Sequence, residues 1–228
     1  MIEYQKKLIH HLSDFITPRR LCLIDKVIQN RTRYITAILE NIYQPHNASA
    51  VLRSCECFGI QDVHILEKSH EYVVNPDVAL GANKWLSIYK YKTGKSHSIP
   101  VLHQLKEKGY RIIATTPHTE NNELEAFDVQ KGKFALCFGT ELEGLSEEIM
   151  GLADEHLKIP ICGFTESFNI SVSAAIMFYT LSHKIKNSNV QWPLSDIEKN
   201  ELKLQWLKKS INRSDLIIKE FNKKQTNG

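Results

Sequence analysis

The 228-residue sequence lacks the features of a membrane or secreted protein. It contains no run of eighteen apolar residues, so it offers no candidate for a membrane-spanning helix. The segment from Met1 to Lys7 has no apolar core of the kind that a signal peptide carries. Because both signals are missing, we expect a cytoplasmic protein without a membrane partner.

Metal, disulfide and nucleotide-loop patterns are missing as well. The five cysteines are an odd number without a C-x-x-C spacing, and the ten histidines show no H-x-x-x-H spacing. These absences argue against a disulfide framework and against a metal site. Neither G-x-G-x-x-G nor G-x4-G-K-(S/T) occurs, which argues against a dinucleotide-binding dehydrogenase and a P-loop enzyme.

The net charge of +3 is small, but the charges are unevenly distributed. Residues 1–34 carry seven basic against three acidic side chains, and residues 195–228 carry eight against five. The middle of the chain has fourteen basic against eighteen acidic side chains. Basic ends on a slightly acidic body predict arms that grip phosphate groups, although lysine-rich ends that only confer solubility remain an alternative.

Short apolar runs alternate along the chain with helical candidates. The runs predict buried parallel strands at 34–40, 62–66, 85–91, 111–116, 134–138 and 156–161. The helical candidates are 48–58, 100–108, 145–152 and 171–186. Strands that alternate with helices predict an α/β fold with a mostly parallel sheet.

Both ends of the chain are predicted to be helical. Leu8, Leu12 and Phe15 have helical spacing, and a second helix is expected over 21–30. Near the other end, Ser195 and Glu198 match a capping box. An apolar residue then recurs every seven positions, at Ile197, Leu204, Ile211 and Ile218. We expect one C-terminal helix whose apolar stripe packs with the N-terminal helices.

Polar side chains follow three of the predicted strands. Asn47 and Arg53 follow the first strand, Glu141 follows the fifth, and Ser167 and Asn169 follow the sixth. The carboxyl ends of strands converge on one site in α/β proteins. The sequence therefore predicts a site for a polar ligand built from these side chains and from turns that contain glycine.

The same segments resemble the three motifs of the SpoU-type RNA ribose methyltransferases. They read N-x5-N-x5-R from Asn41, G-x-E-x-x-G-(L/V)-S from Gly139, and I-P-x-x-G-x3-S-x-N-x-S from Ile159. The resemblance covers about residues 35–186. It implies transfer of a methyl group from S-adenosylmethionine to a ribose 2'-hydroxyl, and an α/β fold with a C-terminal trefoil knot over about 110–186.

The resemblance also implies roles for individual residues. The cofactor would lie against Thr115, Thr116, Gly139, Ile159, Ile161, Phe168 and Asn169. The family's usual leucine between the serine and asparagine of the third motif is Phe168 here. The catalytic set would be Asn47, Arg53, Glu141, Ser167 and Asn169.

Arg53 is the residue that the family places at the hydroxyl, where it is often described as a base. A free guanidinium has a pKa above about 12, which makes it a poor base. We therefore expect Arg53 to bind the substrate phosphate and to stabilise the developing alkoxide.

The flanking segments narrow the expected substrate. The tail from Trp192 to Ser214 resembles the C-terminal helix of the tRNA guanosine-2'-O-methyltransferase branch, which implies guanosine 18 of the tRNA D-loop. A ribosomal-RNA methyltransferase is an alternative, but such relatives commonly carry an N-terminal RNA-binding domain, and about 33 residues are too few for one. A non-catalytic RNA-binding paralogue is a second alternative, which the intact motifs oppose.

We expect three segments and two partners. A helical extension would span 1–33, the methyltransferase domain 34–190, and the C-terminal helical segment 191–228. The partners would be tRNA and a second copy of the chain, because family members are homodimers in which the helices of the first and third motifs meet. The expected RNA-binding residues are Lys6, Lys7, Arg19, Arg20, Lys203, Lys208 and Arg213.

Overall fold

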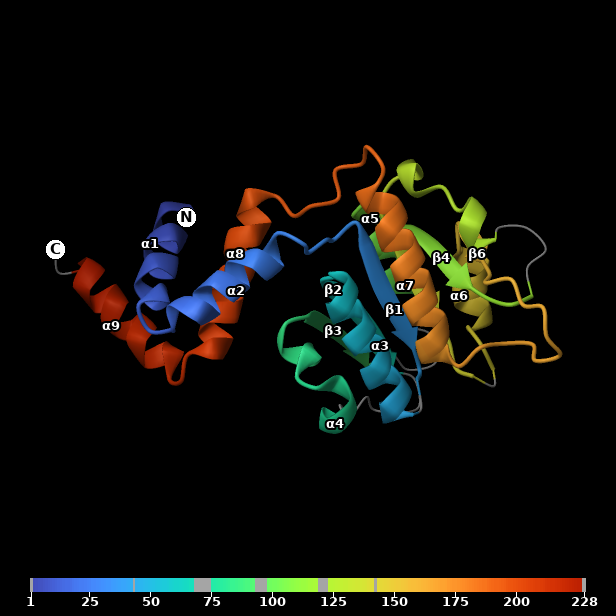
Figure 1. Cartoon of the computed structure of the whole chain (residues 1–228), viewed down its shortest axis with the longest axis horizontal. Coiled ribbons are helices and arrows are strands. Elements are labelled where there is room, and N and C mark those ends of the chain that lie inside the picture. The colour runs from blue at the N-terminus through green and yellow to red at the C-terminus, as the bar shows by residue number, and fades with distance from the viewer. Residues whose placement is uncertain are drawn as a thin grey trace. The chain divides into compact units, whose positions relative to one another are not determined.

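The computed structural model describes residues 2–42, 44–67, 75–92, 98–118, 123–141 and 143–226. The chain forms two compact units, which are shown in Figure 1. The larger unit is Thr32–Trp192, and the smaller unit combines Met1–Arg31 with Pro193–Gly228. Among the described helices, none is long and apolar enough to cross a membrane.

The larger unit is built on a sheet of six strands in the order β3-β2-β1-β5-β4-β6, and every neighbouring pair is parallel. The strands are β1 (Ile35–Glu40), β2 (Asp62–Glu67), β3 (Ser87–Lys92), β4 (Arg111–Thr115), β5 (Phe134–Phe138) and β6 (Glu155–Leu157). The predicted α/β class with a mostly parallel sheet is confirmed. The trefoil knot over 110–186 stays a prediction.

Helices cover both faces of this sheet. On one face, α3 (Pro45–Phe58) and α7 (Ile170–Lys186) lie side by side over an apolar core, as Figure 1 shows. On the other face, α5 (Ser98–Glu107) and α6 (Glu147–Leu152) cover a second core. The connections hold short elements, which are α4 (Pro76–Ala79), η1 (Ala82–Lys84), η2 (Leu124–Ala126) and η3 (Val129–Lys131).

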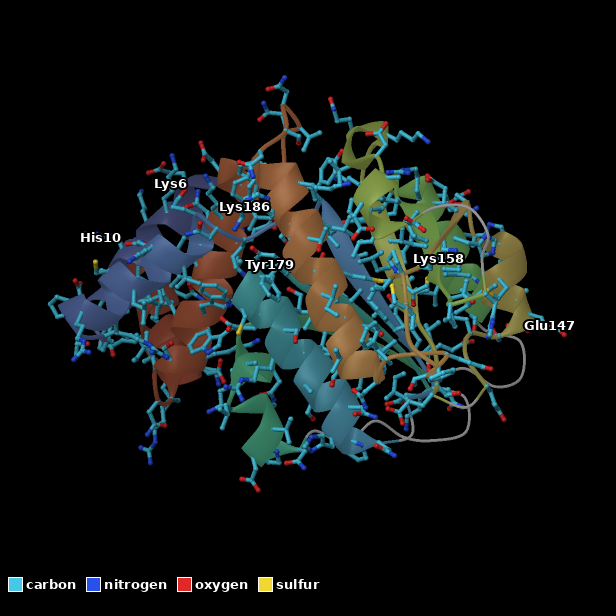
Figure 2. All side chains as sticks on the ribbon, turned by 45° about the vertical axis from the view of Figure 1, so that its right-hand side comes forward. Lys6, His10, Glu147, Lys158, Tyr179 and Lys186 are labelled. Carbon is cyan, nitrogen blue, oxygen red and sulfur yellow. The ribbon has the colours of Figure 1, made fainter. Side chains whose placement is uncertain are left out.

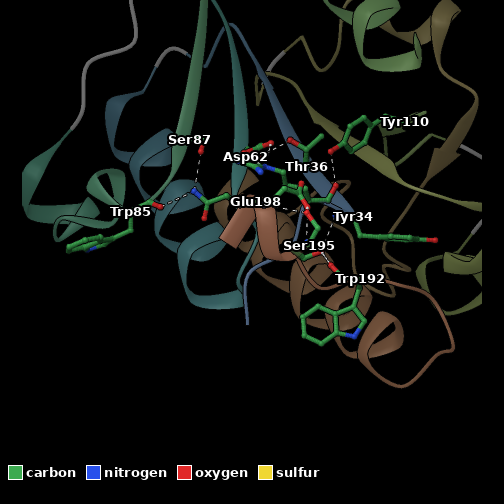
Figure 3. A network of polar contacts seen from close by, with 12 residues as sticks. Tyr34, Thr36, Asp62, Trp85, Ser87, Tyr110, Trp192, Ser195 and Glu198 are labelled. Carbon is green, nitrogen blue, oxygen red and sulfur yellow. Dashed lines mark hydrogen bonds and ion pairs between the residues drawn. The ribbon is translucent and has the colours of Figure 1, made fainter. Parts of the chain in front are cut away.

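Side-chain hydrogen bonds tie the amino ends of the strands together (Figure 3). The Thr36 hydroxyl donates to the carbonyl oxygen of Asp62 over 2.7 Å, which links the starts of β1 and β2. The Tyr110 hydroxyl, just before β4, donates to the carbonyl oxygen of Arg33 over 2.6 Å. Because these contacts satisfy polar groups at the amino ends, the opposite, carboxyl ends are where the sheet can present polar side chains to a ligand.

The smaller unit consists of four helices, α1 (Ile2–Ser13), α2 (Pro18–Ile28), α8 (Asp196–Ser210) and α9 (Ser214–Thr226). Both N-terminal helices contact α8, and α1 also contacts α9. Trp206 lies at the centre of this unit and is 2% exposed, and the guanidinium carbon of Arg31 lies 5.7 Å from the centre of its ring. The other buried apolar side chains include Leu8, Leu12, Ile24, Ile28, Leu202, Leu207 and Phe221.

The structure corrects the expected single C-terminal helix. The predicted capping box at Ser195 is present, but the helix ends at Ser210, and Arg213 adopts φ +54° between α8 and α9. The seven-residue stripe is therefore interrupted, and Ile197 is 54% exposed instead of buried. Phe15, whose spacing from Leu8 and Leu12 predicted a place in the first helix, follows the end of α1 and is 49% exposed.

Candidate active site at the carboxyl ends of the strands

The order of the sheet brings two of the predicted segments together. β1 and β5 are neighbours with Leu39 opposite Phe138, so the segments that follow them leave the sheet from adjacent positions. Asn41, directly after β1, has φ +51°, a left-handed conformation that asparagine adopts more readily than most residues. The turn leads into α3, whose first residue, Pro45, has the fixed φ that suits a helix start.

Asn47, Glu141 and Asn169 form one hydrogen-bonded cluster. The side-chain amides of Asn47 and Asn169 both donate to Glu141 Oε1, over 2.9 Å and 2.5 Å respectively. The Asn169 amide also donates to Asn47 Oδ1 over 3.2 Å. Asn47 is 4% exposed, so its amide is held in a buried position. The three motifs therefore meet at a single carboxylate.

A tight loop delivers Glu141 to this cluster. Thr140 and Gly144 exchange two backbone hydrogen bonds of 3.0 Å and 3.1 Å, and Gly144 has φ +70°. The loop folds back on Gly139 so closely that an added Cβ would lie 2.1 Å from the Gly144 carbonyl oxygen. No side chain larger than hydrogen fits at that position without moving the loop.

Asn169 has a second role at the start of α7. Its Oδ1 accepts a hydrogen bond of 2.9 Å from the Ser171 backbone amide and another of 2.6 Å from the Ser171 hydroxyl. This makes Asn169 the N-cap of α7. One side chain therefore fixes both the helix and Glu141.

A cavity of about 640 Å³ lies beside the cluster. Its wall is formed by the ends of β4, β5 and β6, by the segments that follow these strands, by Met150 of α6 and by the first turns of α7. Most of the residues predicted to hold the cofactor line this cavity, namely Thr115, Thr116, Gly139, Ile159, Ile161 and Phe168. Two members of the predicted catalytic set, Glu141 and Ser167, line it as well. Asn169 is not among the lining residues.

Several charged or titratable lining residues were not predicted from the sequence. They are His118, Glu143, His156, Lys158 and Glu166. All five lie in or after β4, β5 or β6, and a position near the carboxyl end of a strand was the only signal that could have found them. Of these five residues, Lys158 is labelled in Figure 2. The three glutamates that line the cavity favour a ligand that carries positive charge.

A cysteine beside the cavity, Cys137, is not reactive. Cys137 lies in β5, and its carbonyl oxygen accepts a hydrogen bond of 2.7 Å from the Thr115 hydroxyl. Burial raises the pKa of the Cys137 thiol well above its ordinary value. The thiol therefore stays protonated at neutral pH and is not a nucleophile. Within the described ranges, no three or more His, Cys, Asp and Glu side chains are grouped to hold a metal ion.

Arg53 lies apart from the cluster. Six residues at 3.6 residues per turn place it about 120° around α3 from Asn47. It is exposed and does not line the cavity, and none of the residues that the structure describes forms a hydrogen bond or ion pair with its side chain. The described hydrogen-bond partners of the Asn47 side chain are Glu141, Asn169 and Gln44, and Arg53 is not among them.

The predicted RNA-binding residues lie on the smaller unit. Lys6 and Lys7 of α1, Arg19 and Arg20 of α2, Lys208 of α8 and Arg213 between α8 and α9 are all exposed. Lys203 differs, because its Nζ forms an ion pair of 2.5 Å with Asp25. Asp25 belongs to the N-terminal segment, so this ion pair lies within the smaller unit.

Known proteins share both the sequence motifs and the fold of this chain. Residues 34–179 match the model of the SpoU rRNA Methylase family. The chain is 41% identical over 216 residues to a tRNA (guanosine(18)-2'-O)-methyltransferase of Borreliella burgdorferi, which covers 95% of this chain and 97% of the relative. It is 32% identical to a Thermus thermophilus protein of the same name, covering 85% and 98%. The crystal structure of an A. aeolicus TrmH/SpoU tRNA modifying enzyme superposes with a TM-score of 0.76 and 25% identity, covering 86% of this chain and 98% of that one.

Proposed function

Because this chain belongs to the SpoU rRNA methylase family, we propose that it is a tRNA (guanosine(18)-2'-O)-methyltransferase that uses S-adenosylmethionine. One observation carries the proposal. The three motif segments converge on the Asn47–Glu141–Asn169 cluster beside a cavity of about 640 Å³, in a chain that is similar to enzymes of that name over almost its whole length.

The cavity suits S-adenosylmethionine in its size and its chemistry. A volume of about 640 Å³ lies within the range of small-molecule sites. Ile159, Ile161 and Phe168 supply apolar wall for an adenine ring, and Glu141, Glu143 and Glu166 suit a ligand with a positive sulfonium. When bound, S-adenosylmethionine supplies an activated methyl group, so the protein need only position and activate the accepting hydroxyl.

In our proposal the cluster acts as a rigid frame. Glu141 Oε1 receives both amide donors, and no described residue donates to its Oε2. Oε2 would therefore be the oxygen that accepts a hydrogen bond from the ligand or the ribose. Ser167, which lines the cavity, offers a hydroxyl to the same space. Groups held in this way favour in-line placement of the reacting atoms, which is a large part of catalysis for a transfer between two bound molecules.

We propose that Arg53 binds the phosphate next to the target ribose and stabilises the developing alkoxide. A guanidinium fits a phosphate through two parallel N–H donors, and its charge favours an oxygen that is losing its proton. Its exposed position, without a described protein partner, leaves these donors available to RNA.

We further propose that the site is completed in a homodimer. The outer face of α3 and α7 carries Val172, which is 44% exposed, and Tyr179, which is 62% exposed. Tyr179 is labelled in Figure 2, and its ring centre lies 6.1 Å from that of Phe58. An exposed apolar face on the two helices that pack together, one of which carries Arg53, suits a second copy of the chain. Pairing through it would bring Arg53 of one protomer toward the cavity of the other.

We retain the division into a methyltransferase domain over 34–190 and helical segments over 1–33 and 191–228 as part of the proposal. The exposed cations of α1, α2 and α8 would contact phosphates of the tRNA. A cytoplasmic location fits a tRNA substrate.

The test is a transfer assay. The full chain is mixed with tritiated S-adenosylmethionine and with bulk tRNA, with ribosomal RNA or with no RNA, and the product nucleosides are separated. We expect 2'-O-methylguanosine from tRNA alone. Label in ribosomal RNA would favour the ribosomal alternative, and no label in either RNA would contradict an enzymatic role.

A further inference from the structure

The loop between β6 and α7 carries a phenylalanine with no protein partner. The exposed fraction of Phe164 is 109%, so its ring is more accessible than in the reference peptide. None of the residues that the structure describes makes a ring contact with it. A large apolar ring held fully in water serves no purpose in the fold, since its burial would be favourable.

The position of this ring is defined by the cavity wall. Ile159 and Ile161 line the cavity before it, and Glu166, Ser167 and Phe168 line it after it. The chain therefore leaves the wall after Ile161 and returns at Glu166, with Phe164 between. Because an extended chain spans at most about 3.6 Å per residue, the Cα atoms of Phe164 and Glu166 lie within about 7 Å of each other. Phe164 thus stands at the rim of the cavity.

The other aromatic rings at the cavity cannot serve an entering nucleotide in the same way. Phe138 lines the wall but is only 1% exposed, and its ring packs edge-on against Phe178 with ring centres 5.6 Å apart. Phe168 is part of the wall that we assign to the cofactor. Of the Phe, Tyr and Trp side chains described at this site, Phe164 is the one that is exposed without forming part of the cavity wall.

The chemistry of ribose methylation places a base beside this rim. The reacting oxygen is on C2' of the ribose and must reach the methyl group in the cavity, while the base is attached to the neighbouring carbon, C1'. The base of the target nucleotide therefore lies within a few bonds of the cavity mouth, and in a single-stranded RNA loop it is free to unstack from its neighbours. Proteins commonly stabilise an unstacked base by stacking it on an aromatic side chain.

We propose that Phe164 is a substrate-binding residue that stacks on the base of the nucleotide to be methylated. This inference rests on the proposed function and identifies the part of the substrate that the rim of the site holds. Stacking is indifferent to the identity of the base, so Phe164 would contribute affinity and orientation, and base selection would come from other contacts.

The test uses the full chain and a tRNA that carries fluorescent 2-aminopurine at position 18. Stacking on an aromatic ring quenches this fluorophore. We expect wild type and Phe164→Tyr to quench it on binding, and Phe164→Leu, which keeps an apolar side chain but removes the ring, to leave it bright. A second tRNA with the probe elsewhere in the D-loop should respond equally to all three proteins.

Kinetics on unlabelled tRNA provide the second measurement. Phe164→Leu should raise KM for tRNA by about 5- to 150-fold, the range that corresponds to the loss of one stacked base, and Phe164→Tyr should restore it. Calorimetry should give the same S-adenosylmethionine affinity for all variants. Tyr89→Leu is the matched control, since Tyr89 is a 42% exposed ring in β3, at the opposite edge of the sheet from β6.

Three outcomes would overturn the inference. Equal quenching and equal KM for wild type and Phe164→Leu would show that the ring does not touch the base. Dissociation of a wild-type dimer by Phe164→Leu in sedimentation would make the ring a contact between protomers. Weakened S-adenosylmethionine binding would place it in the cofactor site. If wild type itself methylates no tRNA, the proposed function fails instead, which is a distinguishable result.

Discussion

At the scale of single residues, Arg53 is the side chain whose role depends most on a partner that the chain alone does not contain. The sequence places Arg53 in the first motif together with Asn47. The structure shows that the two side chains lie on different faces of α3. Six residues along α3 turn the two side chains to different faces, and Asn47 faces Glu141.

We expect Arg53→Ala to abolish methyl transfer while S-adenosylmethionine affinity stays within a few-fold of wild type. The reason is that Arg53 lies outside the cavity wall but would stabilise charge on the reacting oxygen. Single-turnover rates at saturating tRNA, with calorimetry of cofactor binding, measure both effects. Lys131→Ala, which removes an exposed cation from η3, is the control. Unchanged turnover in Arg53→Ala would remove this residue from the mechanism.

Asn169 permits a separation of two roles within one side chain. Serine in its place can still cap α7 but cannot donate an amide hydrogen to Glu141, whereas alanine can do neither. We expect Asn169→Ala to be less stable than Asn169→Ser by about 1 kcal/mol in the free energy of unfolding.

Both Asn169 variants should lose cofactor affinity or turnover, because both leave Glu141 with one amide donor fewer. Urea unfolding and calorimetry give the two quantities independently. If Asn169→Ala bound S-adenosylmethionine as wild type does and unfolded at the same urea concentration, the place that we give Asn169 in the site would be wrong.

At the scale of elements, the loop of residues 140–144 is the part of the site most sensitive to a small change. A methyl group at Gly139 would have to displace the Gly144 carbonyl, which an added Cβ would approach to 2.1 Å. The displacement would move Glu141 away from Asn47 and Asn169.

We expect Gly139→Ala to lower turnover by about 100-fold, the cost associated with a misplacement of about 1 Å in an active site. Gly151→Ala is the matched control, since a Cβ there meets no atom within 4 Å. Near-normal turnover in Gly139→Ala would mean that the loop geometry does not matter for the chemistry.

The exposed lysines on the helices of the smaller unit are expected to bind tRNA. We expect reversal of Lys6, Lys7 and Lys208 to glutamate to raise KM for tRNA and to flatten its salt dependence, because each phosphate contact releases counterions on binding. Lys203 is left intact in this variant, since its ion pair with Asp25 joins α8 to α2.

The affinity for tRNA is measured across a series of salt concentrations. The control for net charge reverses three exposed lysines of the larger unit to glutamate, namely Lys108, Lys131 and Lys133. If the slope and the affinity both stay as in wild type, the ends of the chain are structural helices only.

The elements also show what the sequence could predict. All six strands were predicted. Most are short runs that are apolar on both faces, which have few other places in a fold, whereas β3 is a partly exposed edge strand rich in tyrosine and lysine. The sixth strand was predicted over 156–161 but spans 155–157, since the apolar residues Ile159 and Ile161 serve the cavity wall instead of the sheet. The single C-terminal helix was wrong because a seven-residue spacing assumes an unbroken helix, and nothing in the pattern marks the left-handed turn at Arg213.

For the site, the sequence predicted which residues lie together but not which hydrogen bonds they form. Strand ends and motif spacing identify which residues gather, because topology brings the carboxyl ends together. The partners of each side chain depend on helix rotation and loop geometry, which spacing does not determine. This is why Glu141 as the shared acceptor of two amides, and Lys203 as the partner of Asp25, emerged only from the structure.

At the scale of the whole molecule, a site shared between protomers requires a dimer. We expect sedimentation to give twice the 26.2 kDa mass of the chain at micromolar concentration. Tyr179→Glu should shift the protein toward the monomer, because it places a charge on the apolar outer face of α7.

Leu216→Glu is the control for Tyr179→Glu, since Leu216 is a 57% exposed side chain on the smaller unit. A wild-type monomer at micromolar concentration would contradict a site shared between protomers, although it would leave the fold and the cavity as described.

The most direct test of the central claim compares two tRNAs that differ in one oxygen atom. One carries guanosine at position 18, and the other carries 2'-deoxyguanosine there. Both are incubated with the full chain and S-adenosylmethionine, and ribonuclease fragments are weighed by mass spectrometry. The account predicts one added methyl group on the fragment that contains guanosine 18, and none on the deoxy tRNA. Equal methylation of both tRNAs, or methylation of the first at any other nucleotide, would contradict it.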